Sequence, residues 1–287
     1  MKAVIPAAGF GTRFLPFTKS VPKELIPILD KPVIQYVVEE AVASGCDDIL
    51  IILSAGKEAI PRHFNPEAAL EQRLAETGKT KILEELRAIG SGASIQYAYQ
   101  KELRGLGDAV LCAESFVGNE PFALLLGDNI TSGPRPMLAE LLDVFRKTSS
   151  FVVAVEEIPR EQTFKYGVID GTDKGGGLYR LRGLIEKPDP AQAPSNLAIC
   201  SRYVFPASVM DCLRNTKPGK NNEIQLTDAM RLLLEREGGH ALKVQAKRHD
   251  AGDKLSFLLT TLEFAMKKPE YREAIRAFFK QLDSRSL

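Results

Sequence analysis

Apolar residues in the first half of the chain are grouped into short runs, which alternate with longer amphipathic segments. Three continuous apolar runs and one alternating run predict strands at Ala3–Ile5, Asp48–Ser54, Pro121–Gly127 and Ser94–Gln100. Helices are predicted between these strands at about 32–44, 66–89 and 108–115. Because strand and helix alternate through residue 147, the pattern indicates an α/β fold with a Rossmann-like, doubly wound, mostly parallel sheet.

In the second half of the chain, strands follow one another closely. They are expected at Phe151–Ile158, Tyr166–Asp170, Leu178–Glu186, Asn196–Phe205 and Ala241–Ala246, with a hairpin turn at the glycines 175–177. Helices are expected at about 206–214, 227–237, 253–267 and 269–282, with Thr227 as an N-cap. We therefore predict a mixed sheet with added β-hairpins in a domain over residues 1–250. A C-terminal helical segment over residues 251–287 packs on this domain.

The first predicted strand leads into a loop of small residues followed by cations. Ala8, Gly9 and Gly11 let backbone N–H groups approach a ligand, and successive N–H groups form an anion-binding nest. Arg13 and Lys23 follow as fixed positive charges. The loop therefore suits a polyphosphate, although a surface turn with solvated cations is the simpler alternative.

Two common phosphate motifs do not fit this loop. A dinucleotide fingerprint needs a third glycine and a helix straight after the turn, whereas this chain has Phe14 and then Pro16 and Pro22, which prevent one continuous helix. A P-loop would end in Gly-Lys-Ser or Gly-Lys-Thr, and this loop does not. A dehydrogenase is therefore excluded.

The stretch AAGFGTRFLPFTKSVPKELIPILDKPVIQYVVEEA resembles the signature of the sugar-nucleotide pyrophosphorylases. Its Lys-Glu-Leu and Gln-Tyr-Val-Val segments look most like the bacterial UTP–glucose-1-phosphate uridylyltransferases, and the resemblance continues to about residue 265. It implies a nucleotide-diphospho-sugar transferase fold that transfers uridylyl from UTP to glucose 1-phosphate. A thymidylyltransferase, another sugar-nucleotide pyrophosphorylase and a catalytically silent nucleotide-sugar-binding paralogue are the alternatives.

Two aspartates directly follow predicted strands. Asp128 comes after the buried run that ends at Gly127, where a carboxylate faces the ligand crevice of an α/β sheet. Asp250 also follows a strand, and Asp253 is the better helix N-cap, which leaves Asp250 without a structural role. A turn aspartate is the alternative for Asp128. The resemblance implies that Asp128 and Asp250 hold the metal, expected to be Mg²⁺.

A base-reading site is predicted where Gln100 ends a strand and Gly105 lies in the following loop. A side-chain amide and the backbone of a glycine can together read the imide edge of a pyrimidine. The Gln-x4-Gly spacing is similar to the base-reading pair of the family, in which many members carry His where this chain has Asp108. By itself, Gln100 could equally be a solvated strand end.

The sugar site is predicted at Gly167 and at the adjacent Glu186 and Lys187. Glu186 can accept hydrogen bonds from sugar hydroxyls, and a lysine is a compact charge for a phosphate. A surface ion pair is the alternative. The Glu-Lys-Pro motif of the family matches, which implies sugar contact by Glu186 and phosphate contact by Lys187. Gly167 would let the backbone approach the sugar.

Composition limits the possible partners. With 38 basic and 37 acidic residues the net charge is +1, which argues against nucleic-acid and membrane-surface partners. Four separated cysteines without a CxxC pair favour buried free thiols and a cytoplasmic location. No apolar run reaches the roughly 20 residues of a membrane span.

The two C-terminal helices carry an apolar stripe. Phe278 and Phe279 are adjacent, so both cannot face one side of a helix. Part of this surface is therefore expected to meet a neighbouring copy, and we predict a homodimer or homotetramer, as the resemblance also implies.

Overall fold

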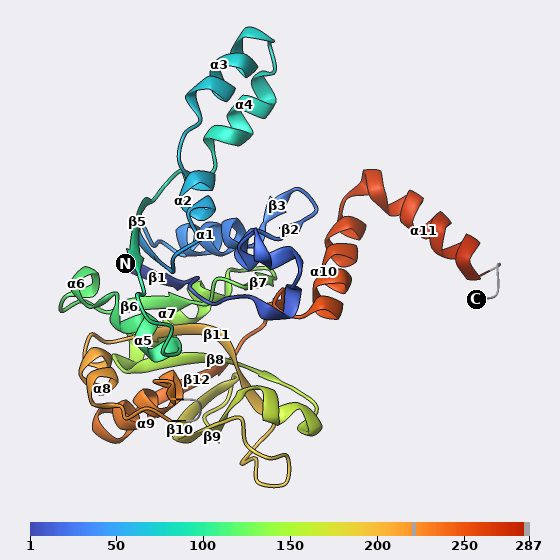
Figure 1. Ribbon diagram of the computed structural model, residues 1–287. Coiled ribbons are helices and arrows are strands. Elements are labelled where there is room, and N and C mark those ends of the chain that lie inside the picture. Colours follow the sequence, from blue (N-terminus) through green and yellow to red (C-terminus); the bar gives the residue numbers. More distant parts are fainter. Residues whose placement is uncertain (220–221, 284–287) are drawn as a thin grey trace.

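A nine-stranded mixed sheet forms the centre of the computed structural model, which describes residues 1–219 and 222–283 (Figure 1). The strand order is β5-β4-β1-β6-β11-β8-β12-β10-β9. The bounds are β1 Lys2–Pro6, β4 Asp48–Leu53, β5 Ser94–Tyr99, β6 Phe122–Leu125, β8 Phe151–Glu157, β9 Gly167–Asp173, β10 Leu178–Glu186, β11 Leu197–Phe205 and β12 Gly239–Lys243. The mixed α/β fold predicted from the sequence is confirmed.

Four parallel strands, β5, β4, β1 and β6, make the half of the sheet that comes from the start of the chain. Their residues alternate between two apolar cores. Val4 and Leu50 belong to the core under α5 (Leu106–Leu111), α8 (Val209–Asn215) and α9 (Leu226–Glu237). Ile5 and Ile51 belong to the core under α1 (Val33–Ala43) and α7 (Met137–Thr148). Burial on both faces explains why these strands are continuous apolar runs in the sequence.

The other half of the sheet closes on itself. β11 pairs with β8 and also with β9, while β12 and β10 complete the circuit between them. The β9–β10 hairpin was expected, and the closure into a barrel-like ring was not. The closing contact is the pair Ala198 and Val168, which are too far apart in the sequence to reveal their pairing.

The helices cover both faces of the sheet (Figure 1). Their bounds are α1 Val33–Ala43, α2 Ala59–Phe64, α3 Ala68–Glu76, α4 Thr80–Arg87, α5 Leu106–Leu111, α6 Glu114–Val117, α7 Met137–Thr148, α8 Val209–Asn215, α9 Leu226–Glu237, α10 Lys254–Lys267 and α11 Pro269–Asp283. None of the helices in the described residues is long and apolar enough to cross a membrane.

Three sequence predictions need correction. The helix expected over 66–89 is two helices, α3 and α4, which are separated at Gly78 by a left-handed φ of 68°. The helix expected over 108–115 is split into α5 and α6. The strand expected at Ala241–Ala246 is β12, and a further short strand, β13 Lys247–Asp250, follows it.

The segment between β1 and α1 is irregular, as its prolines predict. It contains short 3-10 turns at Thr12–Phe14, Phe17–Lys19 and Lys23–Leu25, followed by the small ribbon β2 Pro27–Ile28 and β3 Lys31–Pro32. Backbone N–H groups in such a segment are not consumed by a regular helix. The segment can therefore wrap around a ligand at the carboxyl end of β1.

The last helix, α11, extends away from the body of the protein (Figure 1). α10 packs on β13 and β2, with Phe257 edge-on to Phe14 and Phe264 edge-on to Tyr36. α11 packs against α10. The boundary predicted at residue 250 lies between β13 and α10, and the division into two domains stays a prediction.

All four cysteines are free, as expected. Cys46, Cys200 and Cys212 are buried, and Cys112 is partly exposed. Burial raises the pKa of Cys46 to about 11, so its thiol stays protonated at neutral pH. These cysteines are therefore packing residues. The cytoplasmic location inferred from them remains a prediction.

Candidate active site

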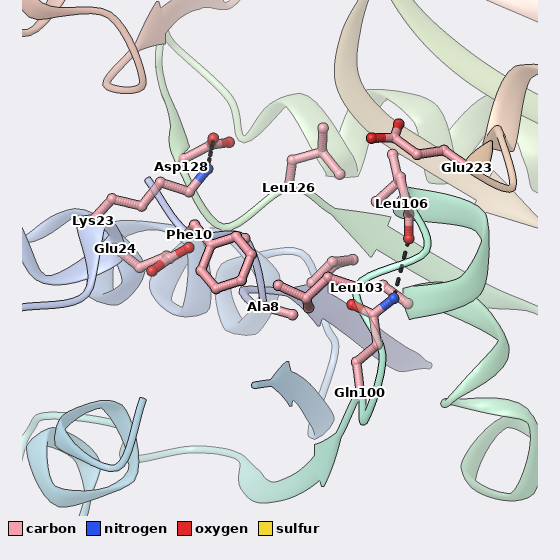
Figure 2. Close-up of a pocket in the computed structure, with 14 residues that line it drawn as sticks. Ala8, Phe10, Lys23, Glu24, Gln100, Leu103, Leu106, Leu126, Asp128 and Glu223 are labelled. Carbon is pink, nitrogen blue, oxygen red and sulfur yellow. Dashed lines mark hydrogen bonds and ion pairs between the residues drawn. The ribbon is translucent and has the colours of Figure 1, made fainter. Parts of the chain in front are cut away.

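A pocket of about 430 Å³ opens at the carboxyl ends of β1, β5 and β6 (Figure 2). Its lining includes six of the residues proposed from the sequence: Ala8, Gly9, Lys23, Gln100, Gly105 and Asp128. Parallel strands bring their carboxyl ends to one edge of the sheet, which is where open α/β sheets bind ligands. This common edge explains why residues from distant segments line one cavity.

Gln100 and Gly105 lie together at one end of this pocket. Gln100 directly follows β5, and its Nε2 donates to the Gly105 carbonyl at 3.2 Å. Gly105 has a φ of 96°, and a Cβ there would lie 2.9 Å from the Cβ of Glu223 and 3.0 Å from the Ile224 carbonyl oxygen. A larger residue would push the loop away from the segment that holds it. Glycine is therefore required at position 105 for two reasons: its φ is positive, and there is no room for a Cβ.

The glycines after β1 give room to Lys23. Gly11 has a φ of 67°, and a Cβ there would lie 3.0 Å from the Cβ of Lys23 and 3.2 Å from the Cγ2 of Thr18. A Cβ at Gly9 would be 3.9 Å from the Lys23 Nζ. The loop therefore holds the lysine stem and directs its ammonium group toward the pocket.

Lys23 and Asp128 form an ion pair, with 2.5 Å between Nζ and Oδ2 (Figure 2). Burial alone would lower the pKa of Lys23, but the charges of Asp128 and Glu24 outweigh it, so the pKa is raised. Burial would raise the pKa of Asp128, but Lys23 reverses that effect and the pKa is lowered. Both groups are therefore charged at neutral pH.

Asp250 comes close to Asp128 through a two-stranded ribbon. β13 pairs antiparallel with β7 (Asn129–Ser132), so that Asp250 lies opposite Asn129, and Ala251 N donates to the Asp128 carbonyl at 3.1 Å. A Cβ at Gly252 would lie 3.1 Å from Asp250 Oδ1 and 3.3 Å from Asp128 Oδ2. The two carboxylates therefore share the space beside Gly252.

Arg13 reaches the same place, since its Nη1 donates to the Gly252 carbonyl at 3.3 Å. Asp253 caps α10 by accepting from Ser256 N at 2.9 Å, as predicted. The expectation that Asp250 has no structural role is wrong, because its Oδ1 accepts from Gly252 N at 2.9 Å and closes a turn. The other oxygen of this carboxylate, Oδ2, lies 3.5 Å from Arg248 Nη1.

The two carboxylates are oxygen donors of the kind that a divalent metal ion takes. No cluster of three or more His, Cys, Asp or Glu side chains that could hold a metal occurs within residues 1–219 and 222–283. Mg²⁺ in nucleotide enzymes is commonly held by one or two carboxylates and completed by phosphate and water oxygens. Asp128 and Asp250, which both have a carboxylate oxygen beside Gly252, match that donor set.

A second pocket of about 170 Å³ adjoins the first and shares Leu106 and Leu126 with it. Gly167, Glu186 and Lys187, the residues proposed for sugar binding, all line it. The structure therefore places four proposed nucleotide residues, Ala8, Gly9, Gln100 and Gly105, in one cavity and the proposed sugar residues in the neighbouring one, whereas Gly11 is not in the lining of either.

Contacts inside the second pocket hold its carboxylate in place. Glu186 Oε2 accepts from the Thr227 hydroxyl at 2.6 Å, and Glu186 Oε1 lies 3.2 Å from the Nζ of Lys187. A Cβ at Gly167 would come within 3.3 Å of Glu186 Oε2. The expectation that Thr227 is a helix N-cap is wrong. Gln225 occupies that position, and the Thr227 hydroxyl is used by Glu186.

Sequence reasoning missed Arg248. Its Nη1 donates to Asn129 Oδ1 at 3.1 Å and lies 3.5 Å from Asp250 Oδ2, and its guanidinium stacks on Tyr166 at 5.0 Å. It thereby links Asp250 and Asn129 to Tyr166, which lines the second pocket. Its place two residues before Asp250, on the same face of a strand, is the signal that could have identified it.

Sequence reasoning also missed the buried pair Arg202–Glu40. Arg202 on β11 is fully buried, and its Nη2 donates to Glu40 Oε2 at 2.7 Å and to the Asn129 carbonyl at 2.8 Å. The carboxylate of Glu40 also accepts from the Thr131 hydroxyl at 2.8 Å. This pair therefore braces the backbone directly after Asp128. No local pattern reveals it, because the two partners lie on elements far apart in the chain.

Residues 2–265 match the family model described as nucleotidyl transferase. The chain is 47% identical over 282 residues to a UTP–glucose-1-phosphate uridylyltransferase from Staphylococcus epidermidis, with 98% of each chain covered.

Two solved structures are also similar. A UTP-bound UGPase from Acinetobacter baumannii has a TM-score of 0.91 and 35% identity, covering 98% of this chain and 99% of that chain. A UDP-glucose pyrophosphorylase complexed with UDP-glucose has a TM-score of 0.86 and 39% identity, covering 93% and 99%. The chain therefore belongs to the nucleotidyl transferase family and, within it, to the UTP–glucose-1-phosphate uridylyltransferases.

Proposed function

We propose that this protein transfers the uridylyl group of UTP to glucose 1-phosphate and releases pyrophosphate. One observation carries the proposal: the pocket with Gln100 at one end and Lys23 at the other adjoins the pocket of Glu186 and Lys187. A nucleotide and a sugar phosphate bound in these two cavities would meet at their phosphates. The relatives named for this activity and the solved complexes with UTP and UDP-glucose support the same assignment.

In the nucleotide pocket, Gln100 and Gly105 read the base, and the backbone of Ala8, Gly9 and Gly11 approaches the phosphates. Lys23 uses one ammonium hydrogen on Asp128 and keeps its other two for phosphate oxygens. Arg13 adds positive charge from the side of Gly252. In the sugar pocket, Glu186 accepts from sugar hydroxyls, Gly167 lets the backbone come close, and Lys187 binds the attacking phosphate.

Asp128 and Asp250 would hold Mg²⁺, which neutralises phosphate charge when it is bound. The family implies a divalent metal, and magnesium is our specific proposal. The positive charges of Lys23 and Arg13 also neutralise phosphate charge. Arg248 keeps Asp250 and Asn129 in fixed positions through its hydrogen bond and ion pair.

The reaction is a direct in-line displacement. A phosphate oxygen of glucose 1-phosphate forms a bond to the α-phosphorus of UTP, and the bond from that phosphorus to the bridging oxygen of pyrophosphate breaks. The nucleophile is already an anion, so no residue has to remove a proton. Catalysis then depends on positioning and on charge neutralisation, which Lys23, Arg13 and Lys187 supply.

For the architecture, we propose the Rossmann-like, doubly wound arrangement of the nucleotide-diphospho-sugar transferases. β1 lies between β4 and β6, with helices on both faces, which supports this proposal. Residues 1–250 would be the catalytic domain, and residues 251–287 a helical segment packed on it.

We also propose that a second copy of the chain covers the C-terminal helices, giving a homodimer or a homotetramer. Leu255, Leu258, Phe278 and Phe279 are all exposed on α10 and α11, at 64%, 53%, 55% and 45%. Burying such side chains against a partner is favourable, and each contributes about 1.5–3 kcal/mol when fully covered.

The activity test uses the purified chain with UTP, Mg²⁺ and glucose 1-phosphate, with pyrophosphate release and UDP-glucose as readouts. Parallel reactions with dTTP and NAD⁺ separate a thymidylyltransferase and a dehydrogenase. Turnover with UTP well above that with dTTP is expected. Equal or greater turnover with dTTP would reassign the base, and UDP-glucose binding without any turnover would identify a silent paralogue.

A further inference from the structure

Asp108 is a buried carboxylate beside the end of the first pocket where Gln100 lies. It sits in the first turn of α5 and is 7% exposed. Its Oδ1 accepts from Arg104 Nε at 3.1 Å and from Arg104 Nη2 at 2.7 Å. Its Oδ2 accepts from Gln100 Nε2 at 2.7 Å. A guanidinium only donates, so the two bonds from Arg104 hold the side chain of Asp108 in place through Oδ1.

This carboxylate fixes which way the Gln100 amide points. A carboxylate has no hydrogen to donate, so Gln100 must turn its NH₂ group toward Asp108. The other partner of Nε2 is the Gly105 carbonyl, which also only accepts. Both amide hydrogens are therefore used on the loop side. The amide oxygen points the other way, toward the side of the pocket where Ala8 and Leu103 lie (Figure 2).

The fixed orientation makes Gln100 an acceptor for whatever base enters the pocket. Uracil carries a hydrogen on N3 and can donate it to the amide oxygen. Cytosine has a lone pair on N3, which would face the same oxygen and repel it. The contact with the amide oxygen is therefore attractive for uracil and repulsive for cytosine, and this difference in binding free energy discriminates the two bases. A repulsive contact costs more when it is buried than when it is exposed to water. Gln100 is 4% exposed, so a mismatch there would be buried.

We propose that Asp108, held by Arg104, is a specificity-determining positioning residue that makes the site select uracil over cytosine through Gln100. The inference rests on the proposed function for the place where the base binds. The alternative is that Asp108 only stabilises the first turn of α5, where a negative charge is favourable. That alternative predicts equal effects on the two nucleotides.

The test substitutes Asp108→Asn, which keeps the shape but adds an amide that can donate to the Gln100 oxygen. Gln100 can then give up its bond to the Gly105 carbonyl, turn over and present its NH₂ group to the base. UTP and CTP dissociation constants are measured by calorimetry with Mg²⁺ present. We expect the preference for UTP over CTP to fall by about tenfold, the scale of one buried hydrogen bond between neutral groups. The KM for glucose 1-phosphate should not change.

Asp143→Asn is the matched control, because Asp143 on α7 also accepts two hydrogen bonds from arginine side chains, one from Arg135 at 2.9 Å and one from Arg146 at 3.2 Å, and both bonds are exposed. Its UTP preference should equal that of the unmodified protein. Asp108→Ser, whose hydroxyl is too short to hold Gln100 in the same way, is the second variant if the asparagine protein does not fold.

A UTP preference within twofold of the unmodified value in either folded Asp108 variant overturns the inference. So does equal weakening of both nucleotides, which would indicate a structural role. These binding measurements need no turnover. An unmodified protein that prefers UTP but forms no UDP-glucose contradicts the proposed reaction, and the preference of the variants still decides the role of Asp108.

Discussion

Asp128 and Asp250 both place a carboxylate oxygen beside Gly252, because Ala251 N donates to the Asp128 carbonyl at 3.1 Å at the end of the β7–β13 ribbon. This backbone bond joins the carboxyl end of a buried strand to a late segment of the chain. The pair is therefore set by main-chain geometry, which a conservative side-chain change leaves intact. That independence makes the two carboxylates suitable for mutational tests.

Asp128→Asn and Asp250→Asn should each lower turnover on the order of a hundredfold or more, comparable to the loss of one preorganised group at a site of developing charge. The fold should remain, as judged by circular dichroism. The measurement is pyrophosphate release over a range of Mg²⁺ concentrations. Asp253→Asn is the matched control, since asparagine caps a helix as well as aspartate does and activity should stay normal. Near-normal activity with an unchanged Mg²⁺ requirement would refute the metal assignment.

Lys23→Ala and Lys187→Ala should separate the two substrates. Lys23 lies in the nucleotide pocket and Lys187 in the sugar pocket, so the first change should raise the KM for UTP and the second that for glucose 1-phosphate. Each lost contact to a phosphate is worth about 1.5–3 kcal/mol, or roughly tenfold to a hundredfold. Steady-state kinetics, in which the concentration of each substrate is varied in turn, measures the two KM values. Equal damage to both substrates by both variants would contradict the assigned roles.

Gly167→Ala should weaken the use of glucose 1-phosphate while leaving UTP binding intact. The added methyl would lie 3.1 Å from the Cδ1 of Ile199 and 3.3 Å from Glu186 Oε2, and so would displace the carboxylate. Gly183→Ala on the same hairpin is the control, because its methyl would meet only Asp170 Cβ at 3.8 Å. A KM for glucose 1-phosphate that is the same in both variants would count against a sugar site here.

Arg202→Leu should lower the free energy of unfolding by about 3–5 kcal/mol, because it leaves the Glu40 carboxylate buried without its charged partner. Arg146→Leu removes an exposed pair with Asp143 and should cost only about 0–1 kcal/mol. Urea denaturation measures both. A cost below about 1 kcal/mol for Arg202→Leu would show that the pair does not brace the Asn129 backbone.

Truncation after Pro269 should reduce the size of the assembly, because it removes the exposed aromatic residues of α11. Light scattering on the full chain and on the truncated chain compares their masses. Leu70→Ser, at an apolar residue of α3 that is 46% exposed, is the control and should leave the mass unchanged. A truncated chain that keeps the oligomeric state of the full chain would exclude α11 from the interface.

The sequence by itself determined the strands, the irregular loop and several residues that line the two pockets. Strands buried on both faces read as continuous apolar runs, and the prolines after Gly11 exclude a helix there. Lys23, Gln100 and Asp128 could be found because each directly follows a local signal, either a strand end or a glycine loop. Such signals come from residues that are adjacent in the sequence, so they can be recognised without the tertiary structure.

Tertiary structure decided everything that depends on partners far apart in the chain. The closure of β9 onto β11, the ribbon of β7 with β13 and the pair of Arg202 with Glu40 each join segments whose local patterns say nothing of one another. Thr227 illustrates the physical reason. Its hydroxyl could cap a helix or donate to Glu186, and only the fold, by bringing Glu186 within 2.6 Å, selects the second.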